Sequence, residues 1–321
     1  MDFACAFLMF RSISHGSDWY LCLLLYNFCA FALQMPLGIL ADKFNRNFLI
    51  AAFGCALVAA AYGLWQVSVL AAVTLGVGNA MFHIGGGIDV LNMSEEKSGA
   101  LGVFVSPGAF GIYFGTMLGK SDGFPALFCV TALFLSVGLI FALRFICGTA
   151  YPQNAEFSIR GANPPKIFAA ILCLFLVVCL RSYVGLASTF PWKNSGYWGI
   201  LLVCAVVFGK IAGGFFADRF GATKTSLFSL GFCALLFCFW QIPLAGIAAV
   251  LLFNMTMPIT LWAMAKIFPQ AKGFSFGLLT FALFLGFLPV HFGAGMSMLL
   301  VPGLAIVSMV LLWAGLKAEK I

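Results

Sequence analysis

Long apolar runs separated by short polar turns make up almost the whole chain. Most of these runs have about 20 residues, the length that a helix needs to cross the ~30 Å hydrocarbon core of a bilayer. The first run has about 12 residues, which indicates a helix truncated at its N-terminal end. The pattern predicts about twelve transmembrane helices, at 2–13, 18–41, 47–65, 69–91, 99–119, 125–146, 167–190, 197–217, 223–241, 245–268, 273–290 and 296–316.

One polar motif closes an apolar run at two places in the chain. The first copy runs from Gly38 to Arg46 (GILADKFNR) and the second from Gly214 to Gly221 (GFFADRFG). A motif that returns at the same place in an apolar pattern indicates an internal duplication. The sequence therefore predicts a six-helix bundle at 1–147, a polar linker at 148–165 and a second six-helix bundle at 166–321.

Composition places the chain among membrane proteins and leaves little room for other classes. Hydrophobic residues make up 63% and charged residues 8%, whereas about 25% of an average soluble domain is charged. The fold class is therefore all-α, as a polytopic membrane protein. The cysteines lie in apolar runs without CxxC spacing, and no HExxH motif or pair of carboxylates occurs. We expect no metal site, no cofactor, no catalytic residues and no enzymatic activity.

The positions of the basic residues predict the orientation in the membrane. The net charge is +7, but the bases stand singly in loops, which favours contact with anionic lipid and argues against nucleic acid. One side has only Arg11, Lys120 and Lys193. By the positive-inside rule the linker and the C-terminus are cytoplasmic, because the other side holds Lys43, Arg46, Lys97, Arg144, Arg160, Lys166, Arg219, Lys224, Lys266, Lys272, Lys317 and Lys320.

Two six-helix halves and the doubled motif resemble the major facilitator superfamily of secondary transporters. Phe82-His83 with Gly85, the KSGA stretch at 97–100 and a glycine-rich fifth helix are similar to the fosmidomycin-resistance type of drug exporters, although Ile84 replaces that type's proline. The face of the fifth helix that carries this pattern holds Pro107, Gly108, Gly111 and Gly115. The resemblance implies a proton-coupled antiporter for efflux, in the plasma (inner) membrane.

The resemblance also implies that the doubled motif forms gates. In the superfamily the motif's aspartate packs against the end of a helix from the other half and is accompanied by a basic partner. The first copy would use Gly38, Asp42, Lys43 and Arg46, with Arg46 able to neutralise the carboxylate. The second copy supplies Gly214, Asp218 and Arg219. The alternative is a topology signal in which the bases only obey the positive-inside rule.

Two cations stand inside predicted helices. An arginine at the centre of a membrane helix costs about 2.5–3.5 kcal/mol, so Arg181 should face a substrate cavity or a buried carboxylate, unless it snorkels to the interface. Lys210 occupies the place of Gln34 in the first half and is expected to snorkel, with a cavity role as the alternative.

Proton coupling needs a titratable group inside the bundle. Asp2 and His83 are the candidates, and histidine titrates near neutral pH; a hydrogen-bonded packing role is the alternative for His83. Asp89 lies about 240° round an ideal helix from His83, so the two cannot form a helical pair. The amides that could line a cavity or bond to neighbouring helices are Asn27, Gln34, Asn79 and Asn254.

The sequence thus predicts a secondary transporter that moves a small organic solute and protons by alternating access in the lipid bilayer, as a monomer. One alternative is a transporter for uptake of organic anions that uses Arg181. Another is a receptor or assembly factor in the membrane that transports nothing.

Overall fold

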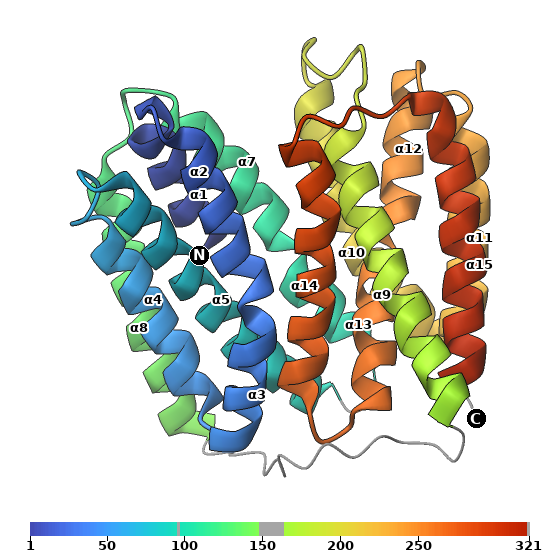
Figure 1. Cartoon of the computed structure of the whole chain (residues 1–321), viewed down its shortest axis with the longest axis horizontal. Helices are drawn as coiled ribbons and strands as arrows, with labels where there is room; N and C mark the ends of the chain where they lie inside the picture. Colours follow the sequence, from blue (N-terminus) through green and yellow to red (C-terminus); the bar gives the residue numbers. More distant parts are fainter. Residues whose placement is uncertain (95–96, 148–163, 320–321) are drawn as a thin grey trace. The chain divides into compact units, whose positions relative to one another are not determined.

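A computed structural model describes residues 1–94, 97–147 and 164–319 of the chain (Figure 1). Every regular element in these residues is a helix, and they contain no strand. The predicted linker at 148–165 lies, apart from its last two residues, outside the described part. Arg160 and Lys320 lie outside it as well.

The first half of the chain forms helices close to the predicted apolar runs. Phe28–Ala32 is a π-helical turn (η2) inside the second span, and Ile13–His15 is a short 3-10 turn (η1). Proline has no N–H group and cannot continue the hydrogen bonds of a preceding helix, so the fifth span divides before Pro107. The helices are α1 Asp2–Arg11, α2 Trp19–Asn27, α3 Gln34–Phe44, α4 Asn47–Ala61, α5 Ser68–Met93, α6 Gly99–Val105, α7 Pro107–Gly119 and α8 Ala126–Cys147.

The second half also consists of helices close to the predicted apolar runs. The span after α11 divides into two helices at Met255, and a 3-10 turn at Met298–Leu300 (η3) precedes the last helix. The helices are α9 Pro164–Ala187, α10 Trp198–Phe220, α11 Ala222–Phe237, α12 Pro243–Asn254, α13 Thr256–Ile267, α14 Lys272–His291 and α15 Val301–Glu319.

Length and hydropathy give the described helices their relation to a membrane. Nine spans in the described part of the chain are long and apolar enough to cross a bilayer, and Asn47–Ala61 and Ala222–Phe237 are shorter apolar helices. The first helix has 10 residues, as its short apolar run predicts. The prediction of an all-α polytopic membrane protein is confirmed.

The chain separates into two compact units, and each takes a segment from the other half of the sequence. Among the described residues, unit 1 contains 1–92, 108–147 and 270–281. Unit 2 contains 93–94, 97–107, 164–269 and 282–319. The start of α14 therefore belongs to unit 1, and α6 belongs to unit 2. Both exchanged segments are the first parts of their spans.

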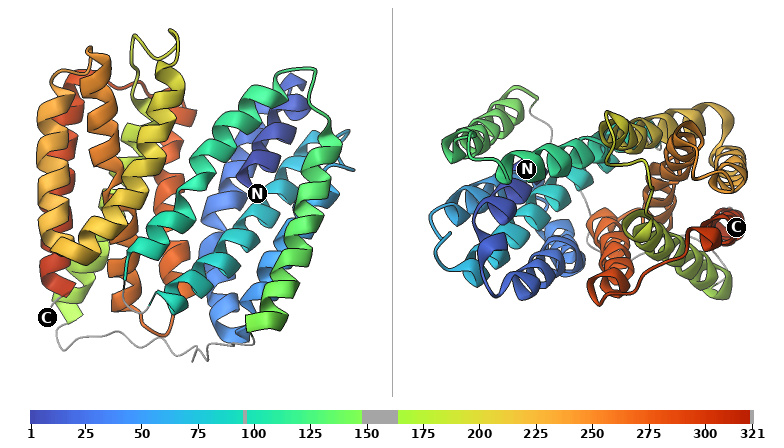
Figure 2. Two further views of the ribbon diagram at one scale, coloured as in Figure 1. Left: turned by 180° about the vertical axis from the view of Figure 1, so that it is seen from behind. Right: turned by 90° about the horizontal axis from the view of Figure 1, so that it is seen from above.

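Each unit is held together by lengthwise packing of its helices. In unit 1, α4 lies along α8, as the blue and green ribbons of Figures 1 and 2 show. In unit 2, α15 packs against both α9 and α11, and α10 packs against α12. Small residues permit the closest approaches: a Cβ atom at Gly54 would lie 2.6 Å from the backbone nitrogen of Phe82 on α5.

Candidate functional site

Asp42 caps the first turn of α14 within unit 1. It lies in the last turn of α3, which ends at Asn45 in the left-handed conformation (φ 48°). Its side chain is 2% exposed, and its oxygens accept hydrogen bonds from the backbone N–H groups of Gly273 at 2.8 Å and Phe274 at 2.9 Å. These N–H groups have no partner within their own helix, and a carboxylate there also gains from the helix dipole.

The basic residues near Asp42 differ in their contacts. Lys43 and Arg46 are exposed, and the ion pairs of the described residues include none between Arg46 and Asp42. Lys272 donates to the carbonyl oxygen of Leu91 at 3.2 Å. The backbone N–H groups of α14 thus hold the Asp42 carboxylate at a helix end from the other half of the sequence, and Lys272 acts on it electrostatically.

Glycines bring the backbones of α3 and α14 into direct contact beside this cap. A Cβ atom at Gly38 would overlap the carbonyl group of Gly273, and one at Gly277 would overlap the carbonyl oxygen of Gln34. Only glycine fits such an approach. The glycine and the aspartate of the motif thus serve one contact.

Asp218 makes the same kind of cap within unit 2. It accepts hydrogen bonds from the N–H groups of Ser98 at 2.6 Å and Gly99 at 2.8 Å, and from the Ser98 hydroxyl at 2.8 Å. Gly214 packs on Ser98, where a Cβ atom would lie 2.6 Å from the carbonyl oxygen. The two caps differ in burial, because Asp218 is exposed whereas Asp42 is buried. Arg219 is also exposed and lies over the Phe220 ring.

Lys210 binds a carbonyl group at the break in the fifth span. Its ammonium group donates to the carbonyl oxygen of Val105, the last residue of α6, at 3.2 Å. The backbone of Lys210 also packs on Gly102. A cation at the C-terminal end of a helix satisfies carbonyl groups that lack a partner in the helix, so α6 is held on α10 at both of its ends.

Arg181 is buried in the middle of α9, which contradicts the snorkelling alternative. Its side chain is 7% exposed, and its guanidinium group donates to the Thr260 hydroxyl at 3.3 Å. In the described part of the chain no carboxylate lies within 4.0 Å of it. The alternative of a partner carboxylate therefore finds no support in the described residues.

Asp2, Asn79 and His83 meet within unit 1. The Asp2 Oδ1 atom accepts a hydrogen bond from Asn79 at 2.8 Å and lies 3.1 Å from the Nε2 atom of His83. Asn79 and His83 stand one turn apart on α5, and both titratable side chains are about one fifth exposed or less. The two proton-coupling candidates, which are far apart in the sequence, thus form one polar cluster.

The glycine face of α7 packs on the helix that carries Asp2. A Cβ atom at Gly108 would lie 2.6 Å from the Oδ2 atom of Asp2, and one at Gly111 would lie 2.8 Å from the Phe3 nitrogen. A Cβ atom at Gly115 would overlap the Phe3 carbonyl oxygen. These glycines therefore leave the space that the Asp2 carboxylate and its helix occupy.

The other polar candidates bond within their own helices. The amide groups of Asn27, Gln34 and Asn254 each donate to the carbonyl oxygen four residues earlier. Asp89, which cannot pair with His83 on the same helix, accepts a hydrogen bond from Asn47 at 2.7 Å. Apart from Asn79, the amides are not gathered into one cluster by these bonds. The Gln34 Oε1 atom is buried without a hydrogen-bond partner among the described residues.

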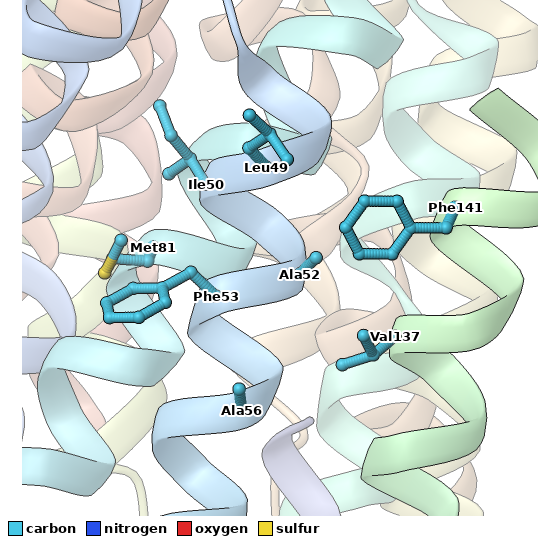
Figure 3. A pocket seen from close by; sticks show the side chains of 8 residues that line it. All are labelled: Leu49, Ile50, Ala52, Phe53, Ala56, Met81, Val137 and Phe141. Atoms are coloured by element: carbon cyan, nitrogen blue, oxygen red, sulfur yellow. The ribbon is translucent and has the colours of Figure 1, made fainter. Parts of the chain in front are cut away.

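An apolar groove of about 440 Å³ lies on α4, between α5 and α8 (Figure 3). Sequence reasoning did not find it, because its lining comes from three helices that only the packing brings together. It is lined by Leu49, Ile50, Ala52, Phe53, Ala56, Met81, Val137 and Phe141.

Comparisons with known proteins relate the chain to others by its structure. No protein-family model matches the sequence, and no curated protein matches it significantly. Solved structures of the *Escherichia coli* fucose:proton symporter FucP match with a TM-score of up to 0.62 and 12–13% identity, over 99% of this chain and 97% of the symporter. A bacterial homologue of the iron transporter ferroportin matches with a TM-score of 0.57 and 15% identity, over 99% of this chain and 98% of the homologue.

The human organic anion transporter TETRAN matches with a TM-score of 0.56 and 14% identity, over 97% of this chain and 83% of the transporter. FucP is described in its outward conformation and the ferroportin homologue in an outward-facing state. At 12–15% sequence identity the similarity covers nearly the whole chain and concerns the fold alone. The chain therefore has the fold of the major facilitator superfamily.

Proposed function

We propose that the protein is a secondary active transporter that moves a small organic solute across the membrane by alternating access and couples this movement to protons. Its fold is shared with a sugar:proton symporter, a homologue of an iron transporter and an organic anion transporter. The observation that carries the coupling is the contact between Asp2 and His83 at 3.1 Å. The function is not enzymatic.

The geometry of this pair suits reversible proton binding. A carboxylate oxygen in contact with an imidazole nitrogen can hold a proton between the two groups, and protonation changes the charge of the pair by one unit. Asn79 donates to the same Asp2 oxygen and fixes the carboxylate in place. Gly108 leaves room for the second oxygen. Uptake of one proton would thus change the charge inside unit 1 without a large movement of side chains.

The two aspartate caps are proposed as gates of the alternating-access cycle. Each holds the start of a span that comes from the other half of the sequence, Asp42 at Gly273 and Asp218 at Gly99. In this proposal the caps form when the protein is closed on the cytoplasmic side and break when it opens there. In this proposal the protein is a monomer in the plasma (inner) membrane, with its linker and C-terminus on the cytoplasmic side. The proposed direction of transport is efflux.

Transport in liposomes tests the coupling. Purified protein is reconstituted with a pH-sensitive dye inside, and a panel of neutral, anionic and cationic solutes is applied with and without a pH gradient. Asp2→Asn should preserve exchange of solute between the two sides but abolish accumulation driven by the gradient. Asp18→Asn is the matched control, because Asp18 precedes α2 and lies outside the cluster. Accumulation by Asp2→Asn equal to that of the unmodified protein would contradict the proposal.

A second candidate function is transport of organic anions, and the position of Arg181 favours it. A buried guanidinium group that has only a hydroxyl partner among the described residues carries an uncompensated charge, which is costly in a membrane helix. The anionic group of a substrate would neutralise it. Arg181→Gln should then reduce thermal stabilisation by anionic solutes far more than by neutral ones. If no solute stabilises the purified protein or exchanges in liposomes, the result supports the alternative of a non-transporting receptor or assembly factor.

A further inference from the structure

The apolar groove on α4 has the form of a site for a hydrocarbon chain. Ala52 and Ala56 stand one turn apart on α4, and Phe53 and Phe141 rise beside them (Figure 3). Phe53 is 57% and Phe141 47% exposed, so the groove opens at the outer surface of unit 1. From Leu49 to Ala56 it follows α4 for about 10 Å, at 1.5 Å per residue, which is roughly two thirds of the hydrocarbon thickness of one leaflet.

The neighbouring surface of α8 faces lipid. Phe145 is 90% and Ile146 76% exposed, and apolar side chains exposed on this scale in a membrane helix contact acyl chains. A lipid chain is thus the natural occupant of this depth and face. A soluble partner could not reach it without displacing lipid.

One end of the groove carries positive charge. Arg144 follows Phe141 by one turn of α8, and its guanidinium group lies 5.2 Å from the centre of the Phe48 ring. The Phe48 ring meets Phe141 edge-on at 6.0 Å, so the cation stands at the edge of the apolar lining. Arg46 is exposed directly before the start of α4.

One acidic group lies near these cations. Asp89 accepts a hydrogen bond from Asn47, and Arg144 acts on it electrostatically. The charge of Asp89 offsets part of the positive charge of Arg144. Arg46 and the exposed Lys43 are not paired with any carboxylate in the described part of the chain, so the end of the groove keeps a net positive charge.

From this juxtaposition we propose that the groove binds one acyl chain of an anionic phospholipid, with the headgroup phosphate held by Arg144 and Arg46. The chain supplies the apolar contact, and the headgroup supplies the charge that complements the two arginines. A zwitterionic lipid would fill the groove equally well but would gain less from the cations. The site therefore prefers lipids with a net negative headgroup, independently of which solute the protein transports.

Lipid titration of the purified, delipidated protein tests the site. Binding is measured in detergent by native mass spectrometry with dioleoyl phosphatidylglycerol, dioleoyl phosphatidylcholine and glycerol phosphate, which carries an anionic phosphate but no acyl chains. Phosphatidylglycerol should bind most tightly and glycerol phosphate should not bind. Because a cation near a membrane surface contributes about fivefold to the binding of anionic lipid, Arg144→Gln should weaken phosphatidylglycerol about fivefold and phosphatidylcholine by a smaller factor.

Two further variants separate the parts of the proposal. Lys317→Gln removes a cation from the last turn of α15, where it lies 5.0 Å from the centre of the Trp313 ring, and should behave like the unmodified protein. Ala56→Phe fills the groove and should weaken both lipids. Equal binding of the two lipids, tight binding of glycerol phosphate, or equal effects of Arg144→Gln and Lys317→Gln would each overturn the proposal. Binding of phosphatidylcholine that Arg144→Gln retains also shows that this variant is folded.

Discussion

Replacing Asp42 by asparagine should release the first turn of α14. The carboxylate accepts two backbone hydrogen bonds at 2.8 and 2.9 Å in a site where it is 2% exposed. A hydrogen bond to a charged group contributes about 1.5–3 kcal/mol, and asparagine keeps one acceptor oxygen while it loses the charge that favours a helix N-terminus. The expected loss is about 2 kcal/mol, which corresponds to roughly a 30-fold shift of the opening equilibrium.

Amide hydrogen exchange reports this equilibrium at the capped residues themselves. In Asp42→Asn, the amides of Gly273 and Phe274 should exchange about 30-fold faster, because each opening exposes them to solvent. The matched variant is Asp218→Asn, which removes the cap from Ser98 and Gly99. Asp218 is exposed, and interactions of exposed charges are screened, so its effect should be no more than about fivefold.

The crossed design distinguishes local release from general loss of stability. Each variant should accelerate exchange at its own helix start and leave the other unchanged. Unchanged exchange at Gly273 and Phe274 in Asp42→Asn would refute the capping argument. Equal acceleration at both helix starts in either variant would show global destabilisation instead.

Two further substitutions test the contacts beside the caps. Gly38→Ala should lower the thermal stability in detergent, because its Cβ atom would overlap the Gly273 carbonyl group and overpacking costs about 1–3 kcal/mol. The control is Gly138→Ala, where a Cβ atom meets no described atom within 4 Å; it should be neutral or stabilising by up to about 1 kcal/mol. An equal loss of stability in both variants would contradict the contact. Lys210→Met should lower the free energy of unfolding by about 1–3 kcal/mol, because it removes the donor to the Val105 carbonyl oxygen. Lys210→Arg keeps a charged donor and should retain most of the melting temperature. Equal melting temperatures of the methionine and arginine variants would contradict the role of the charge.

The helices and the importance of Asp42 could be predicted from local pattern. Apolar runs define the spans because a membrane helix must be apolar over its whole length, and α5 at Ser68–Met93 differs from the predicted 69–91 by only a few residues. Asp42 stands out because an acid at the end of such a run has no part in topology. Its partners could not be found in this way, because Gly273 lies 231 residues further along the chain.

The contacts of two cations could not be read from the sequence. Lys210 was expected at the interface, but the break before Pro107 leaves a carbonyl group for it to bind. Arg46 was expected beside Asp42, but the N–H groups of α14 occupy that carboxylate. A sequence pattern gives the positions of charged side chains but does not show which backbone groups lack a hydrogen-bond partner. The meeting of Asp2 with His83 also depends on how α1 and α5 pack, which no local pattern specifies.

The two aspartate caps are alike in geometry but differ in burial, and Lys210 adds a second contact beside the exposed one. Asp218 is exposed and caps a helix of only 7 residues, so by itself it would hold α6 weakly. Lys210 supplies a second anchor at the other end of α6. The corresponding residue in the first half is Gln34, whose amide bonds to its own helix, and there the buried Asp42 cap is the stronger one. The two copies of the motif thus hold their helices differently. The first uses a buried cap, and the second uses an exposed cap together with the Lys210 side chain. While Lys210 is present, removal of the Asp42 carboxylate should therefore release its helix start more than removal of the Asp218 carboxylate does.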